Sequence, residues 1–426
     1  MQKFIILRKK INYLVSKAEK YTKTDLHYLV RGGFWITLSD LLPLPLSFVL
    51  AFFYARLPTD AYGTFTYALS LAATLSFFTL SGIDTGLTGA VARGHDQTIL
   101  IALKKKIWGG VIGSGIGLGV AAYLYFFKDH HSAELLLITL AFLPFINSFP
   151  LYQAFLSGKK QFATLAKYQT LSKVITTIVL IITLLTTNYI VLLLLVNQAI
   201  YTIVNIFFYY RTIKKYFNPS SEADHQSIEY GKHLSFSTIF NTIVGQFDSI
   251  ILFNLLGPGA LAIYTYAVLP PKQLSSFLGN ISKLALPKFA VQSPVELKKN
   301  IFNKTIKFTL FIVPIFIVYY FLSPYIYHWF FPKYIDSIPY SQIFALSIFT
   351  AASELPYAML NALHAKRAMY QLNGISPILK LVCTVVGIYG FGLTGAMIGR
   401  VVYNFAYFGV TLLLARRSSA SLSSTS

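Results

Sequence analysis

The distribution of lysine and arginine along the sequence constrains the fold of this chain most. About a dozen apolar stretches of about 17–25 residues run along it, each long enough to cross a hydrocarbon core as a helix. Suppose that these stretches cross the membrane in alternating directions and that the first starts on the inside. Three of the 36 lysines and arginines (Arg56, Lys128 and Lys333) then lie on outer connections. Four more lie within the stretches, and the remaining 29 lie on inner connections and the termini. This positive-inside pattern predicts a multi-pass protein of the bacterial inner membrane with both termini in the cytoplasm.

The composition supports a membrane protein and argues against nucleic acid as a partner. Hydrophobic residues make up 55% of the chain and charged residues 12%, about half the charged share of a soluble domain. The net charge of +21 is explained by basic residues that flank membrane helices and face anionic lipid headgroups. Cys383 is the only cysteine, which excludes an internal disulfide and a CxxC metal site.

The expected fold is all-α, with about twelve transmembrane helices in two six-helix lobes. The polar connection from Arg211 to Lys232 divides them. We expect a basic N-terminus at 1–31, an N-lobe at 32–210, a linker at 211–232, a C-lobe at 233–415 and a cytoplasmic tail at 416–426. The individual helices are expected near 32–56, 62–82, 107–127, 134–156, 168–187 and 190–210, and then near 233–256, 261–283, 305–327, 340–360, 376–392 and 394–415.

The first 31 residues do not form a cleavable signal peptide, because lysines and arginines interrupt any apolar core. Ile11, Leu14, Val15 and Ala18 have helical spacing, with lysines on the other face. The segment is therefore predicted to be either an amphipathic helix on the cytoplasmic leaflet or a disordered, positively charged anchor.

An internal repeat agrees with the six-plus-six division. At an offset of 199 residues, PTDAYGTFTYA (Pro58 to Ala68) lies over GPGALAIYTYA (Gly257 to Ala267), so that Thr66-Tyr67-Ala68 falls on Thr265-Tyr266-Ala267. Each block lies at the short outer turn between the first two helices of its half. An even number of helices per half predicts parallel repeats related by an axis along the membrane normal.

Three segments carry a resemblance to a known family: ARLPTDAYGTFTYALSL, SGIDTGLTGAVARG and GQFDSIILFNLLGPGALAIYTYA. They resemble the polysaccharide-export (O-antigen flippase, Wzx-type) branch of the multidrug/oligosaccharidyl-lipid/polysaccharide flippase superfamily. The residues that match its motifs are Arg56, Pro58, Tyr62 and Gly63 in the first turn, Gly82, Asp84 and Arg93 after the second helix, and Asp248, Gly257, Pro258 and Tyr264 around the seventh. The chain departs from the family in its longer N-terminus and in lacking a glycine before Pro58.

The resemblance implies a flippase that moves an undecaprenyl-pyrophosphate-linked oligosaccharide across the inner membrane by alternating access. It implies membrane lipids, the lipid-linked oligosaccharide and glycan polymerase or assembly machinery as partners, no cofactor beyond coupling to protons or sodium ions, and no enzymatic activity. A monomer suffices, because both lobes belong to one chain.

The cargo's pyrophosphate requires cations inside a water-filled cleft. Lys272 follows Pro270-Pro271, which we expect to open the eighth helix, and is the main candidate for a pyrophosphate contact, with a plain ion pair to Asp248 as the alternative. Arg400 either binds phosphate or reaches the outer interface. Arg31 is either an entry contact or a positive-inside anchor.

The acids Asp40, Asp248 and Glu354 are candidates for ion coupling or for charge pairing with these cations. Glu354 could instead pair with Lys366 or Arg367. Each charge inside a span costs at least ~2.5 kcal/mol, so it should face the cleft or a partner. For the remaining two cations within spans, Lys173 and Lys380, we favour snorkelling to the cytoplasmic interface.

The alternatives are a membrane enzyme of the same pathway and an ion-coupled multidrug or small-cation exporter. An enzyme requires an extramembrane site, but the longest expected outer connection, near His328–Pro339, has about a dozen residues. An exporter would be favoured by intramembrane acids without accompanying cations, and Lys272 and Arg400 argue against it.

Overall fold

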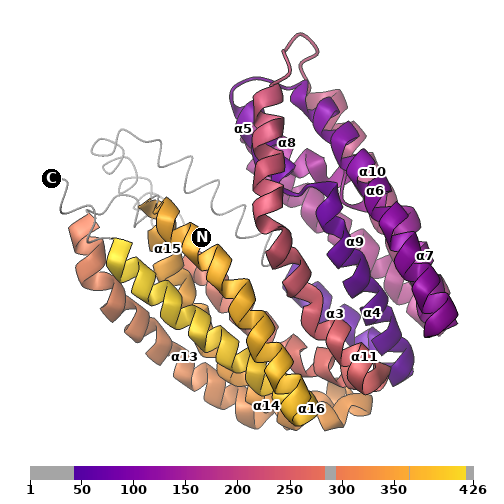
Figure 1. Cartoon of the computed structure of the whole chain (residues 1–426), viewed down its shortest axis with the longest axis vertical. Helices are drawn as coiled ribbons and strands as arrows, with labels where there is room; N and C mark the ends of the chain where they lie inside the picture. The colour runs from indigo at the N-terminus through magenta and orange to yellow at the C-terminus, as the bar shows by residue number, and fades with distance from the viewer. Residues whose placement is uncertain (1–42, 284–293, 364, 419–426) are drawn as a thin grey trace, which may run out of the picture.

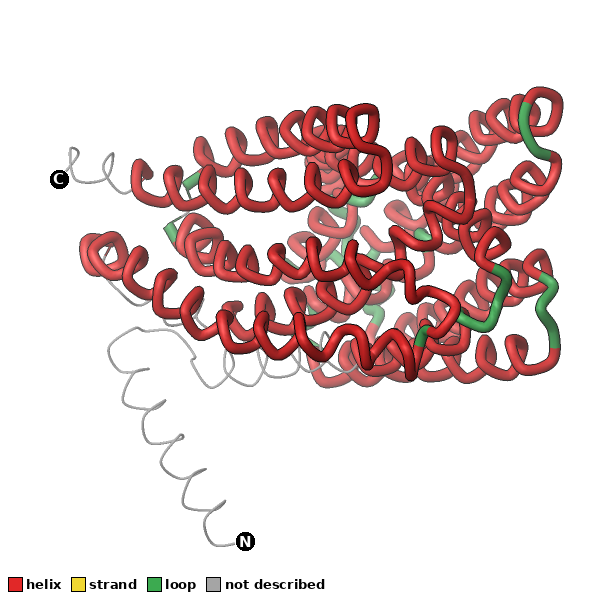
Figure 2. Tube along the Cα trace, turned by 90° about the horizontal axis from the view of Figure 1, so that it is seen from below, coloured by secondary structure: helices red, strands yellow, loops and turns green. Residues whose placement is uncertain are grey.

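The computed structural model describes residues 43–283, 294–363 and 365–418. Every regular element in these ranges is a helix, as Figure 2 shows, and most helices run along a common direction. Eight of the described helices are long and apolar enough to cross a membrane. The prediction of an all-α polytopic membrane protein is confirmed.

The first half of the chain forms a bundle of single crossings joined by short turns. One crossing is bent by 45° where a left-handed Leu80 (φ 56°) separates its two parts, α4 with the short η1 and then α5. The bounds are α3 Pro43–Tyr54, α4 Thr59–Leu75, η1 Ser76–Thr79, α5 Gly82–Ala92, α6 Thr98–Phe127, α7 His130–Ile146, η2 Phe149–Leu151, α8 Tyr152–Gly158, α9 Phe162–Thr186 and α10 Ile190–Tyr216.

The second half contains two long helices that fold back on themselves. In α11 (His225–Lys283) the backbone leaves helical geometry at Gly257 (φ 86°). Asp248 and Tyr264 are 16 residues apart, which is about 24 Å in a straight helix, yet their side chains form a hydrogen bond of 2.6 Å. Gly257 therefore reverses the chain, because its left-handed φ is one that glycine adopts without a steric penalty.

The last helix, α16 (Lys366–Ser418), reverses in the same way at Phe391 and Gly392 (φ 57°). Its two arms lie so close that a Cβ built on Gly399 would be 2.2 Å from the carbonyl oxygen of Cys383. The elements between the two hairpins are α13 Pro294–Phe330, η3 Pro332–Ser337, α14 Ile338–Ala345, η4 Leu346–Ser353 and α15 Glu354–Ala362.

The described helices are consistent with about twelve crossings. Counting each hairpin as two helices raises the eight long helices to ten, and the bent pair of α4 and α5 adds one. α3 is an apolar helix of 12 residues and supplies the described part of one more. The expected amphipathic segment at 1–31 and the tail at 419–426 lie outside the described residues.

The two repeated turns lie against each other and join the halves. Figure 1 shows α4 and α11 close together at the end of the molecule that carries the Gly257 reversal, which we call the turn end. A Cβ built on Gly63 would be 2.0 Å from the carbonyl oxygen of Pro258. Tyr67 stacks on Phe253 with ring centroids 3.9 Å apart, and both halves contribute to the surrounding core.

We call the opposite end of the molecule the linker end. There α10 and α11 extend into the predicted linker, so only residues 217–224 form a non-helical connection between them (Figure 1). Arg93 donates to Asp224 (2.7 Å) and Ser227 (2.6 Å). The Ser227 backbone N–H and the Arg93 guanidinium hold the pKa of Asp224 well below its usual range. The pair therefore remains ionised at physiological pH and fastens the start of α11 to the first half.

Replacing Gly63 by alanine is expected to destabilise the protein, because the added methyl group would collide with the backbone of Pro258. Overpacking of this kind costs about 1–3 kcal/mol. Thermal unfolding of the purified protein measures the loss. The matched control is Gly115→Ala, another glycine within a helix, around which a Cβ meets nothing within 4 Å. If both variants unfold at the wild-type temperature, the close contact of the two turns is not present.

Candidate functional site

A buried carboxylate organises the charged part of the second half. Asp248 lies in the first arm of α11, nine residues before the reversal, and is only 2% exposed. It accepts a hydrogen bond from Tyr264 on the second arm (2.6 Å). Arg400, on the second arm of α16, forms an ion pair with the same carboxylate and donates to the Tyr264 hydroxyl (2.5 Å).

Lys380, on the first arm of α16, completes this cluster. Its ammonium lies 3.8 Å from Asp248 and donates to the carbonyl of Gly245 (2.9 Å). The snorkelling expected of Lys380 is thus replaced by an ion pair inside the protein. One carboxylate connects both arms of both hairpins, and a buried charge requires such partners to be stable.

A cavity of about 600 Å³ opens beside this cluster, toward the middle of the second half. Its charged lining residues are Lys272, Arg400 and Glu354. The volume is typical of a small-molecule site. Two cations and one anion in the wall make the cavity positively charged on balance.

Lys272 is exposed to this cavity and makes no ion pair with a described residue. The alternative that it simply neutralises Asp248 is disfavoured, because Arg400 and Lys380 occupy that carboxylate. The expected opening of the helix at Pro270-Pro271 was wrong. α11 keeps helical backbone angles there and breaks only at Gly257, because proline removes hydrogen-bond donors but has a φ compatible with a helix.

Arg400 is held inside the protein rather than at an outer interface. Its guanidinium lies over the rings of Tyr264 (5.7 Å) and Phe344 (5.5 Å). Both hydrogen bonds to the described residues use Nη1. Nε and Nη2 therefore have no partner in the described part of the chain, and Arg400 also lines the cavity.

Glu354 begins α15 and packs against Gly279 of α11, where a Cβ built on the glycine would be 3.3 Å from the Glu354 Cγ. The side chain of Lys366, one of its expected partners, lies outside the described residues. The candidates Arg31 and Asp40 also lie outside them.

The cavity also has a neutral polar wall that was not predicted from the sequence. Ser276 and Asn280 follow Lys272 at intervals of four residues, so all three lie on one face of α11. Asn404 donates to Ser347 (2.9 Å) on the opposite side. The four-residue spacing of polar residues in an apolar span was the signal that could have revealed this face.

Two residues of the family-like motif after the second helix have structural partners. Asp84 accepts a hydrogen bond from Lys106 of α6 (2.6 Å), and Arg93 binds Asp224 as described above. Both contacts tie helix ends together near the linker end, so neither residue belongs to the cavity.

A family model described as "Polysaccharide biosynthesis protein" matches residues 29–291. The chain belongs to this family. The match extends from before α3 to beyond α11, so it includes Asp248, Tyr264 and Lys272 of the site. No curated relative matches the sequence of this chain.

Solved structures of transporters of the MOP superfamily share its fold. A MATE protein in complex with MaD5 has a TM-score of 0.64 at 14% identity and covers 93% of this chain and 96% of its own. The outward-facing conformation of a multidrug resistance MATE family transporter of the MOP superfamily has a TM-score of 0.62 at 14% identity, covering 94% and 97%. A MOP superfamily transporter from Pyrococcus furiosus, described as having a binding pocket of reverse polarity, has a TM-score of 0.61 at 14% identity, covering 92% and 96%.

Asp248→Asn is expected to destabilise the protein by about 3–5 kcal/mol, because Arg400 and Lys380 would remain buried without a counter-charge. The unfolding temperature in detergent measures the effect. Lys272→Gln serves as the control and should unfold like the wild type, since Lys272 has no ion pair with a described residue. Equal losses in the two variants would contradict a structural role specific to Asp248.

Proposed function

We propose that this protein is a flippase that moves an undecaprenyl-pyrophosphate-linked oligosaccharide repeat unit, of the O-antigen or capsule type, from the cytoplasmic to the outer leaflet. The observation that carries the proposal is the positive cavity, in which Lys272 and the Nε and Nη2 atoms of Arg400 have no partner among the described residues. A dianionic pyrophosphate is the chemical group that such a pair of cations would bind.

The two cations suit different parts of this recognition. The planar guanidinium of Arg400 is fixed by Asp248 and by two rings, so its remaining donors are already oriented. Lys272 contributes a mobile point charge with three donors. With Arg400 as the fixed donor and Lys272 as the mobile one, the pair would keep hold of the anion while the protein changes conformation. Arg31 remains our proposal for an additional contact at the cytoplasmic entry.

The neutral face of Ser276, Asn280 and Asn404 would accommodate polar groups next to the pyrophosphate. The lipid tail can remain in the bilayer, where hydrocarbon does not need a protein partner. We place the protein in the inner membrane with both termini in the cytoplasm, acting as a monomer and delivering the glycan to polymerase or assembly machinery.

Coupling to protons or sodium ions would require an acid that changes its charge during transport. Asp248 is paired with Arg400 and Lys380, which favours charge pairing over ion coupling for this residue. Asp40 and Glu354 remain our candidates for ion coupling or charge pairing.

An ion-coupled multidrug or small-cation exporter is the second candidate, because the solved structures of similar fold include multidrug transporters. An organic cation entering the cavity would meet Lys272 and Arg400, and Glu354 is the one acid among the described lining residues. This repulsion favours the anionic lipid-linked substrate.

Depletion of the protein in its native cells tests the proposal. Full-length lipid-linked repeat units should accumulate on the cytoplasmic leaflet, inaccessible to a membrane-impermeant glycan-oxidising reagent added outside. Lys272→Gln should reduce export at least tenfold, a loss of about 1.4 kcal/mol in the interaction with the pyrophosphate. Lys307→Gln, which removes an exposed lysine of α13 outside the cavity lining, is the matched control and should restore export. Normal exposure of the glycan in depleted cells would exclude the flippase and favour the exporter.

A further inference from the structure

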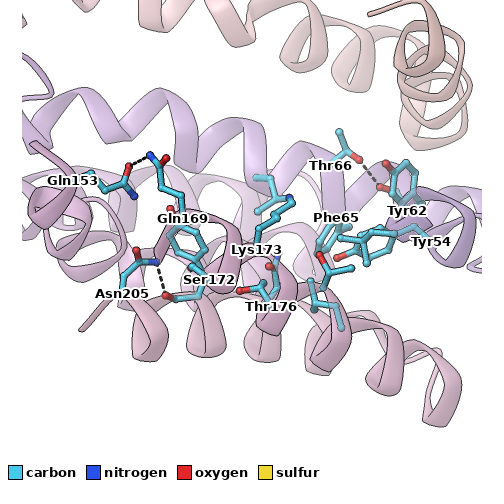
Figure 3. Close-up of a pocket in the computed structure, with 16 residues that line it drawn as sticks. Tyr54, Tyr62, Phe65, Thr66, Gln153, Gln169, Ser172, Lys173, Thr176 and Asn205 are labelled. Atoms are coloured by element: carbon cyan, nitrogen blue, oxygen red, sulfur yellow. Dashed lines mark hydrogen bonds between the residues drawn. The ribbon is translucent and has the colours of Figure 1, made fainter. Parts of the chain in front are cut away.

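A second cavity, of about 520 Å³, lies within the first half of the chain. Residues of α3, α4, α8, α9 and α10 line it, so it is separate from the positive cavity of the second half. Figure 3 shows its labelled side chains in a row, with amides at one end, aromatic rings at the other and Lys173 between them.

The amide end is rich in groups that both donate and accept hydrogen bonds. Gln169 donates to Gln153 (2.8 Å), and Asn205 donates to the carbonyl of Tyr201 (2.8 Å) (Figure 3). At the aromatic end, Tyr54 and Phe65 pack with ring centroids 5.4 Å apart. Amides beside flat apolar rings match a sugar, which has hydroxyl edges and apolar C–H faces.

Three polar atoms of the cavity lining lack the partner that burial normally requires. They are Oδ1 of Asn205, Oγ1 of Thr176 and Oγ1 of Thr177, and none has a hydrogen-bond partner among the described residues. These residues are 1%, 7% and 2% exposed, respectively. A buried polar group without a hydrogen-bond partner is destabilising, so the lining favours a ligand that supplies hydroxyl groups.

Lys173 gives the cavity a positive charge. Its side chain is half-buried in the wall and forms no ion pair or hydrogen bond with a described residue. The described residues that line the cavity include no aspartate or glutamate. The structure thus differs from the expected snorkelling of Lys173 to the interface, because the lysine faces a polar cavity within the bundle.

We propose that this cavity is a glycan-recognition site that binds an acidic sugar, with Lys173 pairing the carboxylate and Asn205, Thr176 and Thr177 binding the hydroxyls. The inference rests on the proposed function, since it assigns this site to the glycan of the lipid-linked cargo and the other cavity to its pyrophosphate. Lys173 then selects repeat units that contain an acidic sugar.

Other occupants fit the lining less well. A cationic drug would be repelled by Lys173, and a lipid tail would leave the buried Asn205 and threonine oxygens unsatisfied. An inorganic anion would use Lys173 but not the aromatic end.

Calorimetry on the purified full chain in lipid nanodiscs tests the assignment with two probes. One is a tetrasaccharide of alternating glucuronate and N-acetylglucosamine, and the other is the same tetrasaccharide with its carboxyl groups reduced to alcohols. We expect the wild type to bind the acidic probe about ten times more tightly, a difference of about 1.4 kcal/mol, since Lys173 would form a charge-assisted hydrogen bond with its carboxylate.

Lys173→Gln should abolish this preference while binding of the reduced probe changes less than about threefold. Lys173→Arg should retain the preference, which shows that the charge is what matters. Lys167→Gln removes an exposed lysine of the same helix and should behave like the wild type. Asn205→Ala should weaken both probes about fivefold or more.

Failure of the inference and failure of the proposed function give different results. If the wild type binds neither probe, or if Lys173→Gln keeps the preference, the glycan site is excluded, whatever the export assay shows. If the preference depends on Lys173 while depleted cells expose their glycan normally, the flippase is excluded and the sugar site stands. Lys272→Gln should retain the sugar preference and still fail in export.

Discussion

The second half of the structure depends on the charge of one buried carboxylate. Asp248 binds Tyr264 across the first hairpin and meets Lys380 and Arg400 from the two arms of the second. A carboxylate in hydrocarbon is prohibitively costly by itself, so its three partners and the reversals at Gly257 and Gly392 stabilise one another. Because Asp248 fixes one side of the Arg400 guanidinium, the other side remains oriented toward the cavity.

The two cavities place different groups in the two halves of the chain. The cavity of the second half has Lys272 and Arg400 in its wall, whereas amides, hydroxyls and rings dominate the cavity of the first half, with Lys173 as the one charge among its described lining residues. The repeated turns join the halves through Gly63 and Pro258. Substrates with one anionic end and one sugar end would match this division, which is why we favour a lipid-linked glycan over a small cation.

Much of the fold could be predicted from sequence, because the membrane limits the choices. The predicted helix ends at 256 and 392 lie next to the reversals at Gly257 and Gly392, since apolar runs must stop where the chain leaves the hydrocarbon. For the site, only the charged residues could be predicted from sequence, and not which of them pair. The partners of Asp248 are up to 152 residues away in sequence, so helix packing alone decides that Arg400 and Lys380, rather than Lys272, neutralise it. The first-half cavity was missed although its residues Gln169, Ser172, Lys173, Thr176 and Thr177 share one face of α9, because only the packing of five helices shows that this face lines a cavity.

The central claim is that the positive cavity binds the pyrophosphate of the substrate. Reconstitution into liposomes tests this claim most directly. The purified protein would be supplied with one fluorescent glycan attached either to a polyprenyl pyrophosphate or to a neutral polyprenyl ether. Arrival at the opposite leaflet would be followed by quenching with a membrane-impermeant reductant. The account predicts rapid movement of the pyrophosphate-linked glycan, slow movement of the neutral one and loss of the difference in Lys272→Gln. Equal movement of both lipids by the wild type would contradict it.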